Sequence, residues 1–186
     1  MPITELDSTT ALVVIDLQVG TLANPTAHSP ADVVARAVEL LAAFRERQLP
    51  IVLANVSGTP AGRNAYGSGA REFPEQWSAL VPELDARSTD ITVTRATWSA
   101  FAGTDLDSTL RALGVTQIVL AGVATSFGVE STARDAYDRG YSVAIAEDAI
   151  TDRSIEAHTS STTGVFPALG QVGTSAEIIH LLSQRL

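Results

Sequence analysis

The sequence has 186 residues, and its 21 acidic against 12 basic residues give a net charge of −9. It contains no cysteine and no lysine, which excludes thiolate nucleophiles, disulfides and lysine Schiff bases. The negative charge repels nucleic acid and anionic lipids, and no run of about 18 apolar residues is present to span a membrane. We therefore expect a single domain over residues 1–186 that is cytoplasmic and has neither nucleic-acid nor membrane partners.

Apolar runs of strand length alternate with segments of helical spacing, a pattern typical of parallel β-α-β units. Residues 12–15 are predicted to form a first strand that is buried on both faces, because its apolar residues do not alternate with polar ones. Ser29 and Pro30 are predicted to begin the first crossover helix. Later strands are predicted at 51–56, 91–94, 117–121, 142–146 and 171–172, and later helices at 106–113, 129–139, 153–163 and from 175 onwards.

The predicted fold is an α/β fold with an open, mainly parallel six-stranded sheet and helices on both faces, a Rossmann-like three-layer α/β/α arrangement. One connection, residues 57–89, is long and rich in glycine and proline, as lids and binding loops are. Trp77 and Leu80 indicate a short helix within it. Thr174, with Glu177 three residues later, predicts a capping box at the start of the last helix.

Residues that follow predicted strands form the candidate site, because open parallel sheets bind ligands beyond the carboxyl ends of their strands. An aspartate after a buried strand has to be paired, hydrogen-bonded or protonated, and we favour a functional role for Asp16 over that of a structural cap. Arg95 is interpreted equally well as a substrate ligand and as the neutralising partner of Asp16. The strand-end residues are Asp16, Gln18, Asn55, Arg95, the turn at 122–126, Glu147 and Asp148.

Other common kinds of site find little support in the sequence. The turn at 122–128 either aims backbone N–H groups at the crevice or is an ordinary turn, and it lacks the G-x-G-x-x-G spacing of dinucleotide-binding proteins. His28, His158 and His180 are far apart in the sequence and follow no predicted strand. We interpret them as surface or helix-face residues, so we expect no metal site and no histidine that activates a serine nucleophile.

Three stretches, at residues 13–18, 95–101 and 122–136, are similar to motifs of the isochorismatase-like hydrolase superfamily. They read VVIDLQ, RATWSAF and GVATSFGVESTARDA, and they resemble D-x-Q, K-x-x-x-S-A-F and G-V-x-T-x-x-C-V-x-x-T-x-R-D-A. The resemblance covers nearly the whole chain. It implies a six-stranded parallel sheet, assembly as a homo-oligomer, either dimer or tetramer, and a cis peptide between Val123 and Ala124.

The resemblance places the family's usual catalytic aspartate, lysine and cysteine at Asp16, Arg95 and Gly128. Two of the three positions therefore differ, which argues against amide hydrolysis through a thioester, as in nicotinamidases and carbamoyl-group hydrolases. The zinc-binding D-x-H of the nicotinamidase branch is replaced by the sequence at 56–58. Isochorismatases proper carry a glycine at the cysteine position and cleave a vinyl ether by protonating carbon and adding water.

The main hypothesis is a hydrolase that acts on a vinyl ether or related small metabolite without a cysteine nucleophile, with Asp16 as general acid or base. Gly128 leaves room for the substrate ring. A positive charge at Arg95 works against an acid role for Asp16 and suits a substrate carboxylate instead. No cofactor or metal is expected, and the expected substrate-binding residues are Gln18, Asn55, Arg71, Trp98, Val123, Ala124, Thr125 and Phe127.

Two alternatives stay open. Because two of the three catalytic positions have changed, the chain is also interpreted as a catalytically inactive member of the family that keeps the pocket and binds a small molecule. A purely structural protomer of a larger assembly is the third possibility, with an interface on the long connection around Phe73 and Trp77.

Overall fold

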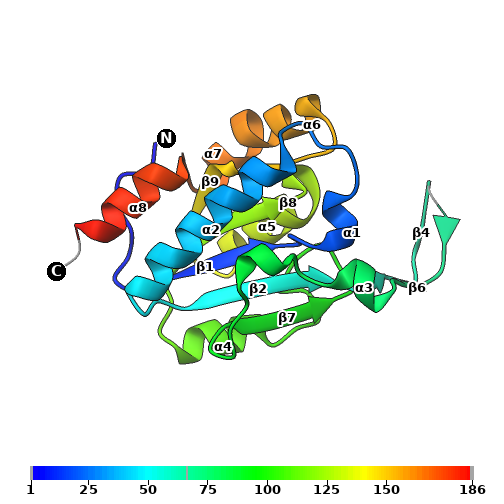
Figure 1. Ribbon diagram of the computed structural model, residues 1–186, viewed down its shortest axis with the longest axis horizontal. Coiled ribbons are helices and arrows are strands. Elements are labelled where there is room, and N and C mark those ends of the chain that lie inside the picture. Colours follow the sequence, from blue (N-terminus) through cyan, green and yellow to red (C-terminus); the bar gives the residue numbers. More distant parts are fainter. Residues whose placement is uncertain (1, 66, 185–186) are drawn as a thin grey trace.

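A six-stranded, fully parallel sheet forms the centre of the protein, shown in Figure 1 as a computed structural model that describes residues 2–65 and 67–184. The strands are β1 (Thr10–Ile15), β2 (Ile51–Val56), β7 (Ile91–Arg95), β8 (Gln117–Val123), β9 (Ser142–Thr151) and β10 (Gln171–Gly173). They lie in the order β10-β9-β8-β1-β2-β7, so the chain first moves from β1 to one edge and then returns to build the other. The order reverses between β1 and β8, which is where open α/β sheets bind ligands.

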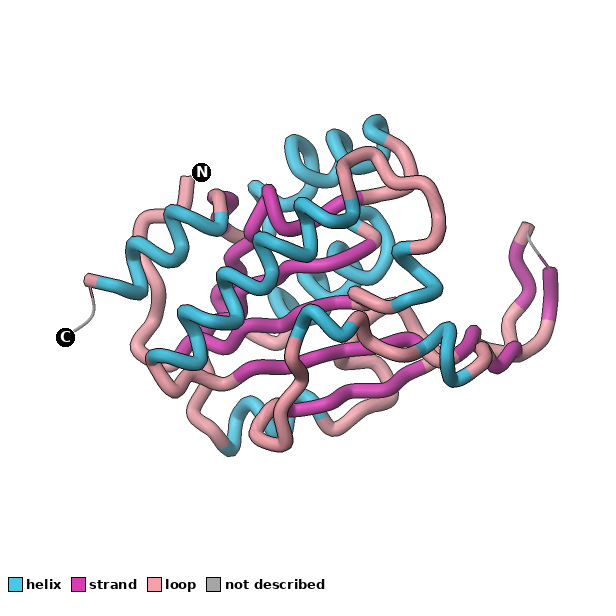
Figure 2. The backbone as a smooth tube through the Cα atoms, viewed as in Figure 1, coloured by secondary structure: helices cyan, strands magenta, loops and turns pink. Residues whose placement is uncertain are grey.

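Helices cover both faces of the sheet, as predicted. They are α2 (Pro30–Glu46), α4 (Leu106–Ala112), α5 (Glu130–Asp138) and α8 (Ser175–Ser183). Leu12 and Val14 of β1 pack with α2 and α8 on one face, where Figure 2 shows α2 crossing the sheet. Val13 and Ile15 pack with α4 and α5 on the other face. Successive side chains of a strand point to opposite faces, so a continuously apolar strand fits a sheet that is covered twice.

The predicted helix starts are confirmed by their caps. Oγ of Ser29 accepts a hydrogen bond from the backbone N–H of Asp32, and Pro30 occupies the first turn of α2. At α8, Oγ1 of Thr174 accepts from the N–H of Glu177, whose carboxylate accepts from the N–H of Thr174. Caps of this kind contribute about 0.5–2 kcal/mol each. Within the described residues, no helix is both long and apolar enough to cross a membrane.

Strand β9 continues to Thr151, beyond its predicted end, because its pairing with β8 resumes after a shift of register. Glu147 and Asp148 therefore lie within the strand, which corrects the expectation that they reach the site. Asp148 accepts hydrogen bonds from the N–H and the hydroxyl of Ser175 at the start of α8, at 2.6 and 2.7 Å. The residue that follows the strand is Asp152.

The predicted helix at 153–163 is divided into two by a wider turn. It begins as α6 (Ile155–Ser160) and passes through a π turn at Ser161–Val165 into α7 (Phe166–Leu169). Pro167 lies in the first turn of α7 and has no N–H to donate to the preceding turn, which favours a break in the regular helix at this point.

The long connection at 57–89 includes an arm, described over residues 57–65 and 67–73, that projects from the body of the protein (Figure 1). Two short antiparallel ladders build the arm, β3 (Gly58–Thr59) with β6 (Arg71–Glu72) and β4 (Arg63–Asn64) with β5 (Gly67–Ser68).

The arm is followed by α3 (Glu75–Ser78) and a 3₁₀ turn at Pro82–Leu84. Helix α3 confirms the predicted short helix, and its Trp77 packs against Gly20 of α1 (Val19–Leu22) so closely that a Cβ there would overlap the ring. The ladders were not predicted, because their residues are polar and show no apolar alternation.

Candidate active site

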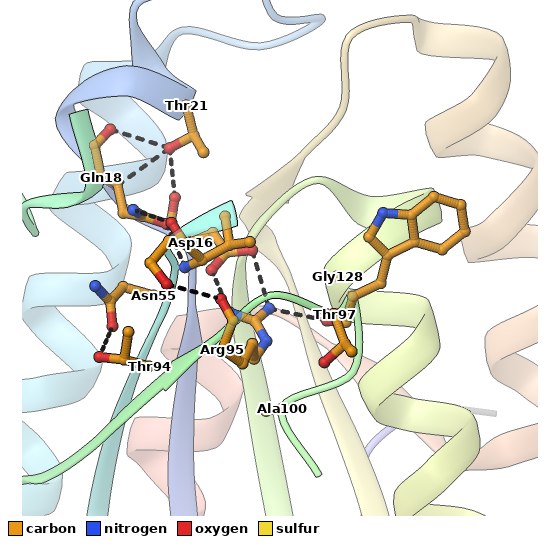
Figure 3. Close-up of polar contacts among 12 residues, drawn as sticks. Asp16, Gln18, Thr21, Asn55, Thr94, Arg95, Thr97, Ala100 and Gly128 are labelled. Carbon is orange, nitrogen blue, oxygen red and sulfur yellow. Dashed lines mark hydrogen bonds and ion pairs between the residues drawn. The ribbon is translucent and has the colours of Figure 1, made fainter. Parts of the chain in front are cut away.

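Three elements meet at the carboxyl edge of the sheet, at its switch point (Figure 3). Asp16 directly follows β1, Arg95 ends β7, and Gly128 lies in a π turn at Thr125–Val129 between β8 and α5. Asp16 adopts a left-handed backbone conformation with φ of 50°. This conformation is uncommon for a residue with a side chain, and Gln48 and Asp85 also adopt it in this protein.

Asp16 and Arg95 form a buried bidentate ion pair. Nη1 of Arg95 lies 2.6 Å from Oδ1 of Asp16, and Nη2 lies 3.0 Å from Oδ2. Only 9% of the Asp16 side chain and 1% of the Arg95 side chain are exposed. Nη2 also donates to the carbonyl of Trp98 at 2.8 Å, whereas the buried Nε has no hydrogen-bond partner among the described residues. Removing one member of such a pair leaves the other charge buried without a partner, which lowers the free energy of unfolding by about 3–5 kcal/mol.

Two opposing effects act on the proton affinity of Asp16. Burial raises the pKa of the Asp16 carboxyl above its ordinary value, because the charged form loses its hydration. Hydrogen bonds and positive charge from Arg95 lower the pKa, and a hydrogen bond involving the backbone of Val56 lowers it further. The effect of burial is the larger one. Arg95 therefore lowers the proton affinity of Asp16, and burial raises it by more.

The backbone of Gly128 lies directly against this ion pair. A Cβ atom at Gly128 would stand 2.8 Å from Cγ2 of Ile15, 3.1 Å from Oδ2 of Asp16 and 3.5 Å from Nη2 of Arg95. The first of these distances is too short for a real Cβ contact, so any side chain at this position requires its neighbours to move. The hydroxyl of Thr132 donates to the carbonyl of Gly128 at 2.7 Å and fixes the turn to α5.

Side chains from α6 and from the end of β9 hold the π turn in place. Oγ1 of Thr125 lies 2.9 Å from Nδ1 of His158. The carboxylate of Asp152 accepts hydrogen bonds from the backbone N–H and the hydroxyl of Ser126, at 2.7 and 2.8 Å. The peptide bond between Val123 and Ala124, just before the turn, is cis, as the resemblance implied. Sequence reasoning missed Asp152 because β9 was predicted to end earlier.

The rings of His28 and His158 are in contact next to the π turn, although the two residues are far apart in the sequence. Their ring centroids are 4.6 Å apart with an interplanar angle of 67°, and Nδ1 of His28 lies 3.0 Å from Oγ1 of Thr151. Burial lowers the pKa of His158, the nearby His28 lowers it further, and Asp152 acts in the opposite direction. Across residues 2–65 and 67–184, no group of three or more His, Cys, Asp or Glu side chains is arranged to hold a metal ion.

Gln18 and Asn55, predicted to bind substrate, both make hydrogen bonds within the protein. The buried Gln18 amide donates to the carbonyls of Val56 and Ser78 at 3.0 and 2.8 Å and accepts from the N–H of Val56 at 2.9 Å. Asn55 donates to the carbonyl of Ser78 at 3.0 Å and accepts from the hydroxyl of Thr94 at 2.7 Å. These contacts join β2 to α3 at the rim of the site, and a role in binding substrate stays a prediction.

The remaining predicted binding residues lie in two places. Trp98 and Phe127 form an edge-to-face aromatic pair next to Gly128, with ring centroids 5.0 Å apart. Arg71 lies on β6 in the projecting arm and is exposed. Of these three residues, Trp98 meets the ion pair through its backbone carbonyl, Phe127 directly precedes Gly128, and Arg71 lies on a separate element.

Comparison with known proteins gives the family. The fold is that of an α/β protein with a parallel sheet, and Asp16 lies at the switch point of that sheet. The isochorismatase domain model matches residues 10–177, and the chain belongs to the isochorismatase family. This result agrees with the resemblance of the three motifs.

Alignments with similar proteins extend over most of the chain. The isochorismatase family protein YecD of Escherichia coli O157:H7 is 40% identical over 183 residues, which cover 94% of this chain and 96% of YecD. A ureidoacrylate amidohydrolase, RutB of Methylobacterium radiotolerans, is 33% identical over 179 residues, covering 80% of this chain and 69% of RutB. The structure of an isochorismatase family protein from Burkholderia thailandensis superimposes with a TM-score of 0.91 at 42% identity, covering 97% of this chain and 98% of that one.

Proposed function

We propose that the protein is a hydrolase that acts without a covalent intermediate, with Asp16 as general acid and base and a vinyl ether or related small metabolite as substrate. The observation that carries the proposal is the Asp16 carboxyl, whose Oδ2 faces Gly128 at the position where the family's usual nucleophile stands. Membership of a hydrolase family supports the reaction class. The absence of a side chain at Gly128 lets substrate and water approach the carboxyl directly.

The reaction follows from the chemistry of one carboxyl group. Protonated Asp16 donates its proton to the terminal carbon of the enol ether, and the electron pair of the double bond forms the new C–H bond. Water attacks the resulting oxocarbenium carbon, and the Asp16 carboxylate accepts the proton that the water loses. The hemiketal then collapses: its bond to the leaving alcohol breaks, and its hydroxyl proton passes to the departing oxygen. A ketone and an alcohol are released, and Asp16 is again protonated.

The surroundings of Asp16 support proton transfer in both directions. Burial favours the acid, and Arg95 stabilises the carboxylate once the proton has left. We assign the transfer to Oδ2, because its contact with Arg95 is the longer of the two, at 3.0 Å, and because it faces Gly128.

The same ion pair favours a second candidate, a catalytically inactive member of the family that binds a small molecule. Both carboxylate oxygens of Asp16 accept hydrogen bonds from Arg95, so the carboxylate is paired without a substrate. In that case Asp16 serves to hold the guanidinium toward a ligand, and no proton is transferred.

Turnover separates the two candidates. The purified protein is assayed against an enol-pyruvyl ether, a ureido amide and a carboxylic ester, together with Asp16→Asn and Asp107→Asn. Asp107 is the matched control, since it is a carboxylate on α4 that pairs with Arg111. We expect ether hydrolysis that is lost in Asp16→Asn and kept in Asp107→Asn, with thermal unfolding confirming that both variants are folded at the assay temperature.

Two results contradict the proposal. Hydrolysis at an unchanged rate in Asp16→Asn would show that Asp16 takes no part in the reaction. No turnover of any substrate, combined with a metabolite that raises the melting temperature, favours the inactive binding protein.

A further inference from the structure

The outer part of the arm is exposed at every described residue. This part comprises residues 60–65 and 67–72, and it contains β6 and both strands of the β4–β5 ladder. Figure 2 shows these strands standing clear of the central sheet and its helices. A two-stranded ribbon alone is at best marginally stable in water, and it needs further strands or a packed face to hold it. The arm therefore has the form of an element that packs against another chain.

The base of the arm is joined to the carboxyl edge of the sheet. The N–H of Ser57, directly after β2, donates to the carbonyl of Arg95 at 2.8 Å, and the N–H of Phe73 donates to the carbonyl of Ser57 at 2.8 Å. Phe73 also packs on Trp77 of α3, with ring centroids 4.3 Å apart. The arm thus leaves the body from the same edge of the sheet that carries Asp16.

Large apolar side chains are exposed at this edge as well. Of the five that are exposed in the described part of the chain, three follow strands whose carboxyl ends lie here. They are Val19 after β1, Trp98 after β7 and Ile155 after β9, which are 42%, 59% and 48% exposed. Apolar side chains that gather at one end of a protein are typical of a surface that another protein covers. One partner can therefore contact both these side chains and the arm.

The arm is basic, whereas the rest of the chain is acidic. Residues 57–73 contain two arginines, Arg63 and Arg71, and one acidic residue, Glu72. The whole chain carries −9, so the residues outside the arm carry −10. An arm with a net charge of +1 is attracted by the body of a second copy of this chain, and two arms repel each other. The charges favour contact of an arm with the body of another copy over contact between arms.

We propose that two copies of this chain form a dimer by exchanging their arms. Each arm packs on the acidic body of the other copy, and the two carboxyl edges face each other. A two-fold axis closes the exchange, because each copy offers one arm and receives one. The exposed Val19, Trp98 and Ile155 are covered where the two edges meet. Assembly through the arm requires no reaction at Asp16.

Sedimentation velocity tests the exchange by mass. The wild type should sediment with twice the 19.5 kDa of one chain. In a trimmed variant, Asn-Gly replaces residues 60–70, so that a two-residue turn joins Thr59 to Arg71, which are paired in the β3–β6 ladder. The trimmed variant should sediment as a single chain, with circular dichroism confirming that it is folded. A wild type that sediments as a single chain, or a folded trimmed variant that still sediments as a dimer, overturns the proposal.

Arg63→Glu tests the charge of the arm without removing it. It should raise the dissociation constant of the dimer about 10-fold, because each dimer loses two exposed ionic contacts and gains two repulsions. Arg47→Glu is the matched control, since it changes the net charge equally. Arg47 is exposed and donates to the carbonyl of Ser183 in α8, at the end of the protein opposite the arm (Figure 1). A dissociation constant that both variants raise equally, or that Arg63→Glu leaves unchanged, contradicts docking on an acidic body.

The absence of cysteine allows the neighbour of the arm to be identified by cross-linking. Ser68→Cys places a single thiol on β5, and benzophenone maleimide on this thiol cross-links to the chain beside it. After subunit exchange with isotopically heavy wild type, mass spectrometry should find the light arm joined to peptides from the heavy body. Ser183→Cys, at the end of α8, is the control and should give no such pairs. Cross-links that form only within one chain, or only between two arms, overturn the exchange.

Discussion

A Cβ atom on Gly128 would stand 3.1 Å from Oδ2 of Asp16, so only the backbone of this glycine lies beside the carboxyl. The same atom would stand 2.8 Å from Cγ2 of Ile15, and Ile15 is completely buried. The site is therefore packed around a glycine.

Gly128→Ala should destabilise the protein by about 1–3 kcal/mol, because the added methyl group overpacks against Ile15. Urea unfolding measures the change. Gly164→Ala is the control, since a Cβ at Gly164 meets nothing within 4 Å and its φ is not in the left-handed region. Equal stabilities for Gly128→Ala and the wild type would show that the site tolerates a side chain.

Breaking the ion pair should be costly. Asp16→Asn and Arg95→Met each leave one buried group without its partner, and each should lower the free energy of unfolding by about 3–5 kcal/mol. The double variant should lose less than the sum of the two, and a double-mutant cycle measures the difference. The exposed pair of Arg36 and Glu39 provides the comparison and should show only weak coupling. Additive single losses at Asp16 and Arg95 would contradict a strong pair.

His158 should make the protein less stable at mildly acidic pH. Its pKa is lower in the folded than in the unfolded chain, so the unfolded chain binds more protons as the pH falls below 6.5. Stability is thus complete above that pH and is lost as the pH falls toward the folded pKa. Chemical unfolding between pH 5 and 8 should show a smaller loss for His158→Asn, whereas His180→Gln, on the exposed face of α8, should follow the wild type. If the stability of His158→Asn depends on pH as that of the wild type does, His158 is not the cause of the loss at acidic pH.

Tyr141 should make stability fall at high pH. Burial raises the pKa of Tyr141 to about 12, and the hydrogen bond that its hydroxyl donates to Asp107 acts in the same direction. The unfolded chain releases this proton near pH 10, so stability is lost as the pH rises from 10 to about 12. Tyr141→Phe should flatten the decline, and Tyr137→Phe, at an exposed position, should not. A flat wild-type profile over this range would contradict the prediction.

The sequence predicted the sheet and its helices because these depend on local pattern. The apolar run of β1, the cap at Ser29 and the capping box of Thr174 and Glu177 each act within a few residues. Asp16 and Arg95 were found by the same logic, since each comes at the end of a strand and parallel strand ends share an edge.

Contacts between distant segments were not predictable in this way. The meeting of His28 with His158 joins the loop before α2 to α6, and no periodicity indicates it. Asp152 was missed because the end of β9 depends on a register shift against β8, which is a property of the pairing. Gln18 was expected to face a ligand, but whether an amide contacts substrate or backbone depends on where α3 lies.

The most direct test of the central claim is to hydrolyse an enol-pyruvyl ether in D₂O, trap the pyruvate by reduction, and locate the deuterium by mass spectrometry. Proton transfer from Asp16 to carbon predicts a single deuteron in the methyl group of the product. It also predicts no product above the enzyme-free control from Asp16→Asn. Product formed by the wild type without deuterium in the methyl group, or formed by Asp16→Asn at the wild-type rate, would contradict catalysis by carbon protonation at Asp16.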